Sequence, residues 1–347
     1  MYRRYVLKRI AYGLMMYVVM IFIYSSLFNG SADVTMRSQI DEQVAQESTR
    51  LHGFTEAQLK TIVAQRKADK YSQYHLDEPL ASRIFWRSLR TLAFDFGNST
   101  TIKASNGDRL VTLIIMEALP RTIILFTTEV VLTTLIGVAM GLYAARKPNG
   151  LLDRSVSVIT MITNGLPGWW LSMLAIMAFS YAIPIFPSGG LHINPAPAGL
   201  AGLADFLWHL SLPLLSLVLL SIWGTAYLTR NIVLTNLQED YVMAARARGI
   251  RESKVLFGHT LRSAMPAIMT LAILGLFSSI AGNIIVEGIF GWPVIGNLYF
   301  IAVEQNDVPV LMGTLAIETL FNMVGFILLD LVYGLLDPRI KAGGRAS

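Results

Sequence analysis

The chain has 347 residues, of which 54% are hydrophobic and only 15% are charged. Soluble domains carry charge on about a quarter of their residues, so this composition favours a membrane protein over a soluble enzyme. The absence of cysteine excludes disulfide frameworks, iron–sulfur clusters and thiolate zinc sites. The net charge of +5 fits nucleic-acid binding or basic loops on one side of a membrane, and the distribution of the charges decides between them.

Six apolar stretches have the length of about 20 residues that a helix needs to cross a bilayer. They are Ile10–Phe28, Leu110–Ala144, Val156–Ile183, Leu210–Leu228, Ala267–Phe290 and Val310–Leu336. The second and the last exceed one straight span, which predicts tilt or an interfacial turn at their ends. Pro167, between Gly165 and Gly168, is expected to break the third span.

The distribution of lysine and arginine sets the orientation of these spans. The segments 1–9, 145–155, 229–266 and 337–347 hold 16 of the 28 basic residues, whereas the short loops 184–209 and 291–309 hold none. The positive-inside rule therefore predicts a multi-pass membrane protein with both termini in the cytoplasm. No basic face remains for nucleic acid. The first span is expected to be a retained anchor rather than a cleaved signal peptide, because Asn29-Gly30-Ser31 lacks the small-x-small pattern.

The long segment 29–109 is expected to lie outside the membrane. Thr55-x-x-Gln58 has the pattern of a capping box, which predicts a helical cap within residues 31–75, with a partly mobile insertion as the alternative. Further on, an apolar helix face (Ile84, Phe85, Trp86, Leu89, Leu92, Phe94) lies opposite Arg83, Arg87 and Arg90. The favoured interpretation is an interfacial helix whose arginines extend to water, and the alternative is a docking surface for an external partner.

Motifs for covalent chemistry are missing from the sequence. It contains no G-x-x-x-x-G-K-[ST] phosphate loop, no H-E-x-x-H and no G-x-S-x-G elbow. The five histidines are scattered without the spacing of metal ligands. We therefore expect a chain that is not itself an enzyme and that binds no metal or cofactor.

The inner segment 236–266 predicts a short docking helix. Acidic residues open the stretch 239–248, arginines close it, and Gly249 fits a left-handed C-cap. Small alanines leave its backbone open to close approach by another protein. The alternative is an ordinary solvated loop.

The stretch Tyr241–Gly249 resembles the cytoplasmic EAA loop of ABC importer permeases, in the branch for dipeptides, oligopeptides and sometimes nickel, although Met243 stands where the general motif has Glu. Further stretches resemble the same family in the same order. They are Leu76-Asp77-x-Pro79-Leu80, Asp95-Phe96-Gly97-x-Ser99, Phe186-Pro187-Ser188-Gly189-Gly190, Glu287-x-x-Phe290-x-x-Pro293-x-x-Gly296, Asp307-x-Pro309-x-x-x-Gly313 and Asp330-x-x-Tyr333-x-x-x-Asp337-Pro338-Arg339. Residues 31–75 are longer than the corresponding segment of typical members and match no recognisable motif of that family.

The resemblance implies a complex of two homologous permeases, two cytoplasmic ATPases that bind ATP and Mg, and an external substrate-binding protein, with lipid around the permeases. The residues implied in coupling to an ATPase are Glu239, Asp240, Tyr241, Val242, Ala244, Ala245, Arg246, Arg248 and Gly249. The implied cargo is a di- or oligopeptide; nickel chelates, glutathione and oligosaccharides are alternatives. A stand-alone channel, a secondary transporter and a membrane-embedded enzyme are disfavoured.

Placing a charged carboxylate inside an apolar span costs about 2.5–3.5 kcal/mol or more of free energy, so each one needs a partner or a water-filled cavity. Glu129, Glu287 and Glu318 are candidates for a substrate pathway, and helix-to-helix packing is an equal alternative. Glu117 and Arg121 are spaced to pair on one helix face.

The expected fold is an all-α membrane protein with six transmembrane helices and a cytoplasmic EAA-type coupling helix. It divides into an anchor helix, 1–28, an external helical segment, 29–109, and a five-helix core, 110–347, with the coupling loop at 236–266.

Overall fold

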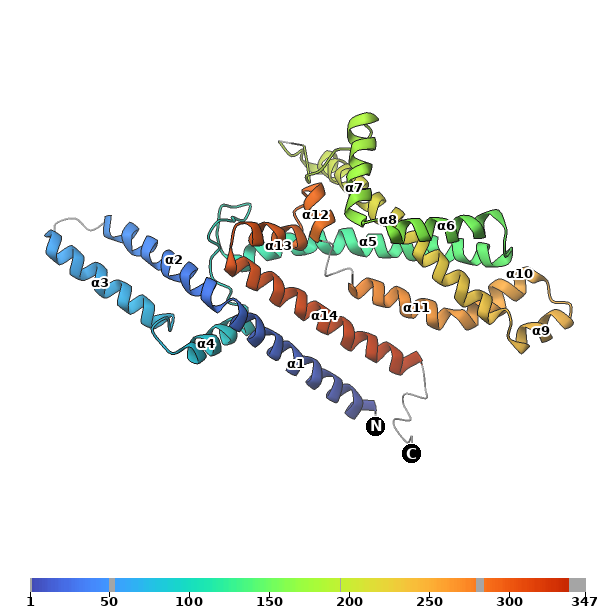
Figure 1. Ribbon diagram of the computed structural model, residues 1–347, viewed down its shortest axis with the longest axis horizontal. Helices are drawn as coiled ribbons and strands as arrows, with labels where there is room; N and C mark the ends of the chain where they lie inside the picture. Colours follow the sequence, from blue (N-terminus) through green and yellow to red (C-terminus); the bar gives the residue numbers. More distant parts are fainter. Residues whose placement is uncertain (1, 50–53, 194, 279–283, 337–347) are drawn as a thin grey trace. The chain divides into compact units, whose positions relative to one another are not determined.

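The computed structural model describes residues 2–49, 54–193, 195–278 and 284–336, whose regular elements are helices, with no strand among them (Figure 1). The helices are α1 (Tyr2–Leu27), α2 (Asn29–Thr49), α3 (Glu56–Gln73), α4 (Leu80–Leu92), α5 (Val111–Arg146), α6 (Leu151–Gly165), α7 (Gly168–Ile176), η1 (Met177–Ala182), α8 (Gly199–Asn236), α9 (Asp240–Ala247), α10 (Glu252–Lys254), η2 (Val255–Thr260), α11 (Leu261–Ser278), α12 (Ile284–Phe290), α13 (Ile295–Glu304) and α14 (Val308–Leu336). The basic segment 337–347, with the Asp337-Pro338-Arg339 motif, lies outside the described residues.

Four helices in the described part are long and apolar enough to cross a membrane, namely Val6–Leu27, Val111–Arg146, Gly199–Asn236 and Val308–Leu329. They contain most or all of the predicted first, second, fourth and sixth spans. The predicted fifth span falls on α11 and α12, on either side of residues 279–283, which are not described. The all-α class is therefore confirmed, and the number of six spans stays a prediction.

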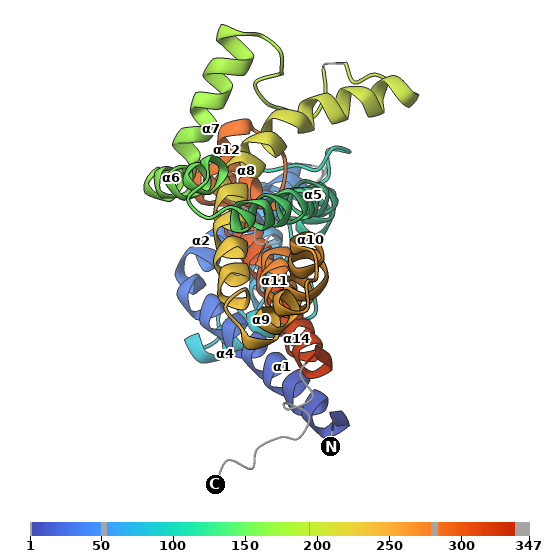
Figure 2. The same cartoon turned by 90° about the vertical axis from the view of Figure 1, so that its right-hand side faces the viewer.

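The predicted third span is broken where the sequence indicates. Leu166 is extended (φ −106°, ψ 139°), as the residue before a proline prefers, and Pro167 opens the next helix. Helix α7 leaves α6 at a steep angle in both views (Figures 1 and 2). The last turn of this region, η1, is a π-helix. The break therefore follows from local backbone chemistry.

The chain divides into two compact units, and the first consists mainly of Pro120–Asn297. Within it, α5 and α8 approach closely at Gly137 and Gly141, a small-xxx-small pair. A Cβ on Gly141 would lie 2.7 Å from the Cβ of Thr229, and a Cβ on Gly137 would lie 2.8 Å from the Cβ of Thr225. Glycine at both positions is what allows the two helices to pack at this distance.

A bidentate ion pair joins α6 to α8. Arg230 donates from Nε and Nη2 to the two oxygens of Asp153, at 2.6 and 3.0 Å, and the backbone N–H of Asn149 donates to the same carboxylate at 2.7 Å. Asp153 is buried. Its hydrogen bond with Arg230 holds the pKa of Asp153 below its ordinary value. The start of α6 is thus fixed to α8.

The second unit consists of Leu7–Leu119 and Leu298–Met323 and contains the α2–α3 hairpin. The capping box predicted at Thr55 is present, with the Thr55 backbone N–H donating to the Gln58 side chain at 3.1 Å. Ile40, Val44 and Leu76 form a small core under the hairpin. Residues 56–73 are therefore helical, as expected, while the proposed division at 28 and 109 stays a prediction.

Two of the sequence motifs, Asp95–Ser99 and Asp307–Gly313, contact each other in this unit although they lie far apart in the sequence. The buried Asp307 carboxylate accepts from the Ser99 hydroxyl at 2.5 Å and from the backbone N–H groups of Thr100 and Thr101 at 3.0 and 3.1 Å. A few residues on, Gly313 packs against the side chain of Phe96. The Asp95–Ser99 and Asp307–Gly313 motifs therefore form one structural joint.

The close approach of α5 and α8 gives a stability prediction. Gly141→Ala should lower the free energy of unfolding by about 1–3 kcal/mol, because its Cβ would overlap Thr229 and the Ala226 carbonyl. Gly224→Ala is the matched control, since nothing lies within 4 Å of a Cβ there. Thermal unfolding in detergent should show a lower midpoint for Gly141→Ala alone. Equal midpoints in the two variants would contradict the packing argument.

Candidate functional site

The predicted docking helix is α9, Asp240–Ala247, with Glu239 in the extended conformation of an N-cap. Its C-terminus is a Schellman motif. The backbone N–H of Gly249 donates to the Arg246 carbonyl at 2.9 Å, and that of Ile250 donates to the Ala245 carbonyl at 3.3 Å. Gly249 takes the left-handed conformation, with φ +71°. The C-cap expected from the sequence is therefore present.

The inner side of α9 packs on the rest of the first unit. Val242 and Ala245 are buried and form a cluster with Val255 of η2, and Leu237 and Ile250 pack against it. On the surface, Arg246 holds Glu252 with two hydrogen bonds, at 2.7 and 3.3 Å. These contacts fix α9 to the end of α8 and the start of η2.

The remaining residues predicted for coupling lie on the outer side of α9 or at its ends, and all are exposed. They are Glu239, Asp240, Tyr241, Ala244, Arg246, Arg248 and Gly249. Met243 is exposed as well. Two of the nine predicted residues, Val242 and Ala245, thus face inward and support the helix. The outward surface therefore combines small side chains with arginines.

A second candidate site is a cavity of about 380 Å³ in the same unit. Side chains from α5, α8 and α11 line it, and most of its polar groups are hydroxyls. The polar lining residues are Glu129, Thr133, Thr134, Ser221, Thr225 and Thr229. Its volume lies within the usual range for small-ligand pockets, about 300–1,000 Å³.

Glu129 is the ionisable group among the residues that line this cavity. Only 8% of its surface is exposed. Its carboxylate accepts from the Thr133 hydroxyl at 3.0 Å, and Ser221 on α8 hydrogen-bonds it as well. Within the described residues these hydroxyls are its partners, and none of them carries a charge. A carboxylate so placed is suited to meet a cation that enters the cavity.

The structure does not bring the other two pathway candidates to this cavity lining. Glu287, 1% exposed, accepts from the backbone N–H of Asn297 at 3.0 Å, and its carboxylate fills the space beside Gly296. This environment supports a packing role. Glu318 is half-buried on α14 and belongs to the second unit. Glu117 accepts from Ser105, and Arg121 donates to the Pro293 carbonyl at 3.4 Å.

Sequence spacing also missed a buried cluster at the start of α8. Asp205 accepts from His192 Nδ1 at 3.1 Å and from the Ile193 backbone N–H at 3.0 Å, and His209 Nδ1 lies 3.3 Å from its other oxygen. This cluster ties the loop after η1 to α8. Among the described residues, no group of three or more potential ligands is arranged to hold a metal. The i, i+4 spacing of Asp205 and His209 is the signal that could have shown half of the cluster.

Comparisons with known proteins place this geometry in context. Residues 137–342 match the family model of the binding-protein-dependent transport system inner membrane component. The chain is 32% identical to the oligopeptide transport system permease protein AppB of Bacillus subtilis over 71% of its length and 76% of AppB. It is 30% identical to a putative peptide permease protein of Brucella suis over 97% of its length and 99% of that protein.

Among solved structures, the chain is similar to a chain of the MetNI methionine ABC transporter in inward facing conformations, with 17% sequence identity and a TM-score of 0.47. The match covers 63% of this chain and 96% of the other chain.

The family model covers more than half of the chain, and the matched residues include α9 as well as α8 and α11, which line the Glu129 cavity. The match agrees with the family resemblance of the sequence motifs. This chain therefore belongs to the binding-protein-dependent inner membrane components, the multi-pass permeases of ABC importers.

Proposed function

We propose that this chain is the permease subunit of an ATP-driven importer that moves di- or oligopeptides across the cytoplasmic membrane. The names of its relatives support the cargo, since they are permeases for oligopeptides and peptides. Membership of this family supports the proposal that the chain functions together with ATPases and an external binding protein. A second homologous permease would complete the pathway, and both termini would lie in the cytoplasm.

The observation that carries the proposal is the exposed outer face of α9. Its inner face is packed and its end is fixed by a Schellman motif, so that a push on α9 moves the attached helices with it. The sequence has no phosphate loop, and the force must therefore come from another chain. In this proposal α9 sits in a groove of a cytoplasmic ATPase and transmits closure of the nucleotide-bound dimer.

The energy required is modest. A few kcal/mol of coupling suffices to shift a helical assembly between inward-facing and outward-facing packings. ATP and Mg would be bound by the ATPases, with no cofactor on this chain.

The Glu129 cavity is proposed as part of the substrate pathway. A peptide carries a cationic α-amino group, and Glu129 offers an acidic group whose partners among the described residues are uncharged hydroxyls. Glu287 and Glu318 remain weaker candidates for this pathway. Nickel chelates, glutathione and oligosaccharides are the alternative cargoes. A stand-alone channel or secondary transporter is the second candidate function.

Reconstitution separates these functions. The chain alone in liposomes should move no peptide, whereas the complex with its second permease, ATPases and binding protein should move peptide only with ATP. The measurement is uptake of a labelled oligopeptide with ATP or with a non-hydrolysable analogue. Flux through the isolated chain, independent of nucleotide, would contradict the proposal.

Gly249→Val should uncouple ATP hydrolysis from uptake. A left-handed conformation costs a residue with a Cβ about 1–2 kcal/mol, and a β-branched side chain suffers most, so the end of α9 should shift. Peptide moved per ATP hydrolysed in proteoliposomes is the measurement. Gly249→Asn is the matched control, because asparagine tolerates this conformation and should keep coupling near the wild-type level. Normal coupling in the valine variant would remove α9 from the mechanism.

Glu129→Gln should lower peptide uptake by about tenfold or more, since a hydrogen bond to a charged group contributes about 1.5–3 kcal/mol. The glutamine keeps the volume of the side chain and its Thr133 contact but loses the charge. Thr133→Val tests packing, because it removes a hydroxyl partner and leaves the carboxylate. Uptake at saturating binding protein should fall much further for Glu129→Gln than for Thr133→Val. Equal values would show that Glu129 serves only helix packing.

A further inference from the structure

Helix α4 has the opposite burial pattern from an amphipathic helix that packs on a protein in water. Its polar Ser88 and Thr91 are buried, whereas Phe85, Trp86 and Leu89 are 47, 38 and 44% exposed. A helix that packs on a protein in water buries its apolar side and exposes its polar side. The reversed arrangement indicates that an apolar medium or partner covers the outer face of α4.

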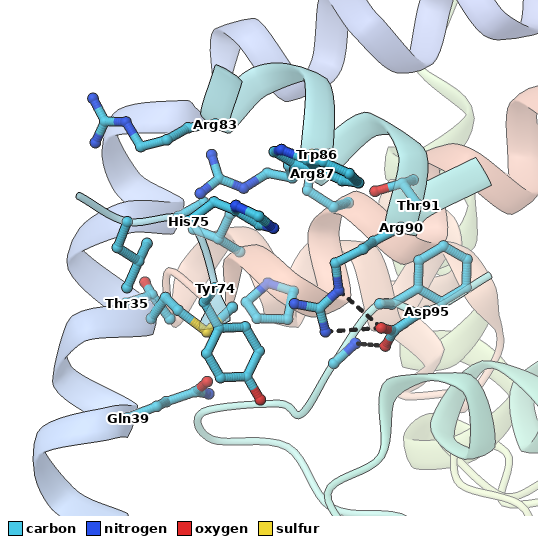
Figure 3. Close-up of a pocket in the computed structure, with 18 residues that line it drawn as sticks. Thr35, Gln39, Tyr74, His75, Arg83, Trp86, Arg87, Arg90, Thr91 and Asp95 are labelled. Carbon is cyan, nitrogen blue, oxygen red and sulfur yellow. Dashed lines mark hydrogen bonds and ion pairs between the residues drawn. The ribbon is translucent and has the colours of Figure 1, made fainter. Parts of the chain in front are cut away.

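Two of the three arginines of α4, Arg83 and Arg87, are paired inside the protein. Arg87 donates to the Asn29 side chain at 2.5 Å and to Asp33 at 2.6 Å, and Arg83 also pairs with Asp33. Both arginine side chains are mostly buried, at 22 and 16% exposure. The expectation that these two arginines extend to water is therefore wrong. Figure 3 shows Arg83 and Arg87 on the same helix as Trp86. The Trp86 ring stacks on the His75 ring, with 4.6 Å between the ring centroids.

The contacts of α4 place it at the end of a membrane span. Asn29 and Asp33 directly follow the apolar stretch Val6–Leu27 of α1, and Asp33 lies roughly 9 Å beyond Leu27 at 1.5 Å per residue. The ring of Phe85 meets that of Phe22, inside this stretch, with centroids 6.2 Å apart. The exposed face of α4 therefore begins at the depth of the last turns of the span.

This face continues an apolar surface of α1. Val19, Ile23 and Leu27 are exposed on α1, as lipid-facing side chains of a spanning helix are. Aromatic side chains such as Trp86 and Phe85 are typical of the boundary between lipid and water. Lipid is the occupant that covers both helices without a break.

We propose that Phe85, Trp86 and Leu89 dock into the outer leaflet of the bilayer. Through Asp33, the paired arginines then tie the α2–α3 hairpin to this buried helix. The hairpin is thereby held at a fixed level relative to the membrane, outside the permease core. The chemical partner is the acyl-chain and glycerol region of lipid, and no headgroup charge is needed.

Site-directed spin labelling tests the proposal, and the natural absence of cysteine makes every introduced cysteine unique. Phe85→Cys and Leu89→Cys are labelled in the full chain, in nanodiscs of phosphatidylethanolamine and phosphatidylglycerol. Oxygen partitions into lipid, whereas a water-soluble nickel complex does not. Both labels should show high collision rates with oxygen and low rates with nickel, close to those of Val19→Cys on α1.

Lys60→Cys on the exposed side of α3 is the aqueous control and should show the opposite pattern. Nickel rates at positions 85 and 89 equal to those at position 60 would overturn the proposal. Shielding that arises only after the second permease, the ATPases and the binding protein are added would assign the face to a protein partner and overturn it as well. Circular dichroism of each variant confirms that the helical fold is kept.

Discussion

A buried carboxylate must be given hydrogen bonds or a counter-charge, and this constraint organises the first unit and the joint at Asp307. Asp153 is held by Arg230, Asp307 by hydroxyl and backbone donors, and Glu287 by a backbone N–H. Each of these groups fixes one segment to another, and each therefore serves the fold. Glu129 also accepts from hydroxyls, but it differs from the other three because a cavity lies beside it. The cavity is therefore what distinguishes Glu129 from the three structural acids, and it is the basis for proposing that Glu129 meets a cation.

Local chemistry made much of the fold and of α9 predictable. Pro167 and Gly249 act on their own backbone, and the Thr55 capping box acts within one turn, so the sequence around each position carries enough information. Long apolar stretches likewise predicted the helices of Val6–Leu27 and Val111–Arg146. These predictions needed no knowledge of which segments meet.

Tertiary contacts could not be predicted, because they depend on which distant segments of the chain meet. Asp205 and His192 are 13 residues apart, and Asp307 meets Ser99 across 208 residues, so spacing along the chain says nothing of either contact. For α4 the sequence showed an apolar face and arginines, but it could not show that Arg83 and Arg87 pair with Asp33 of α2 instead of extending to water. On α9, the i, i+3 spacing of Val242 and Ala245 could have shown which of the nine residues turn inward.

The two candidate sites share their supporting helices. Helix α8 lines the cavity with Ser221 and Thr225 and then runs on to Asn236, four residues before α9 begins. Helix α11 lines it with Ile268 and follows η2, whose Val255 packs under α9. A helix is stiff along its axis, because each added residue is fixed by a further hydrogen bond. In the proposed mechanism, movement of α9 would therefore reach the walls around Glu129 along α8 and, by way of η2, along α11.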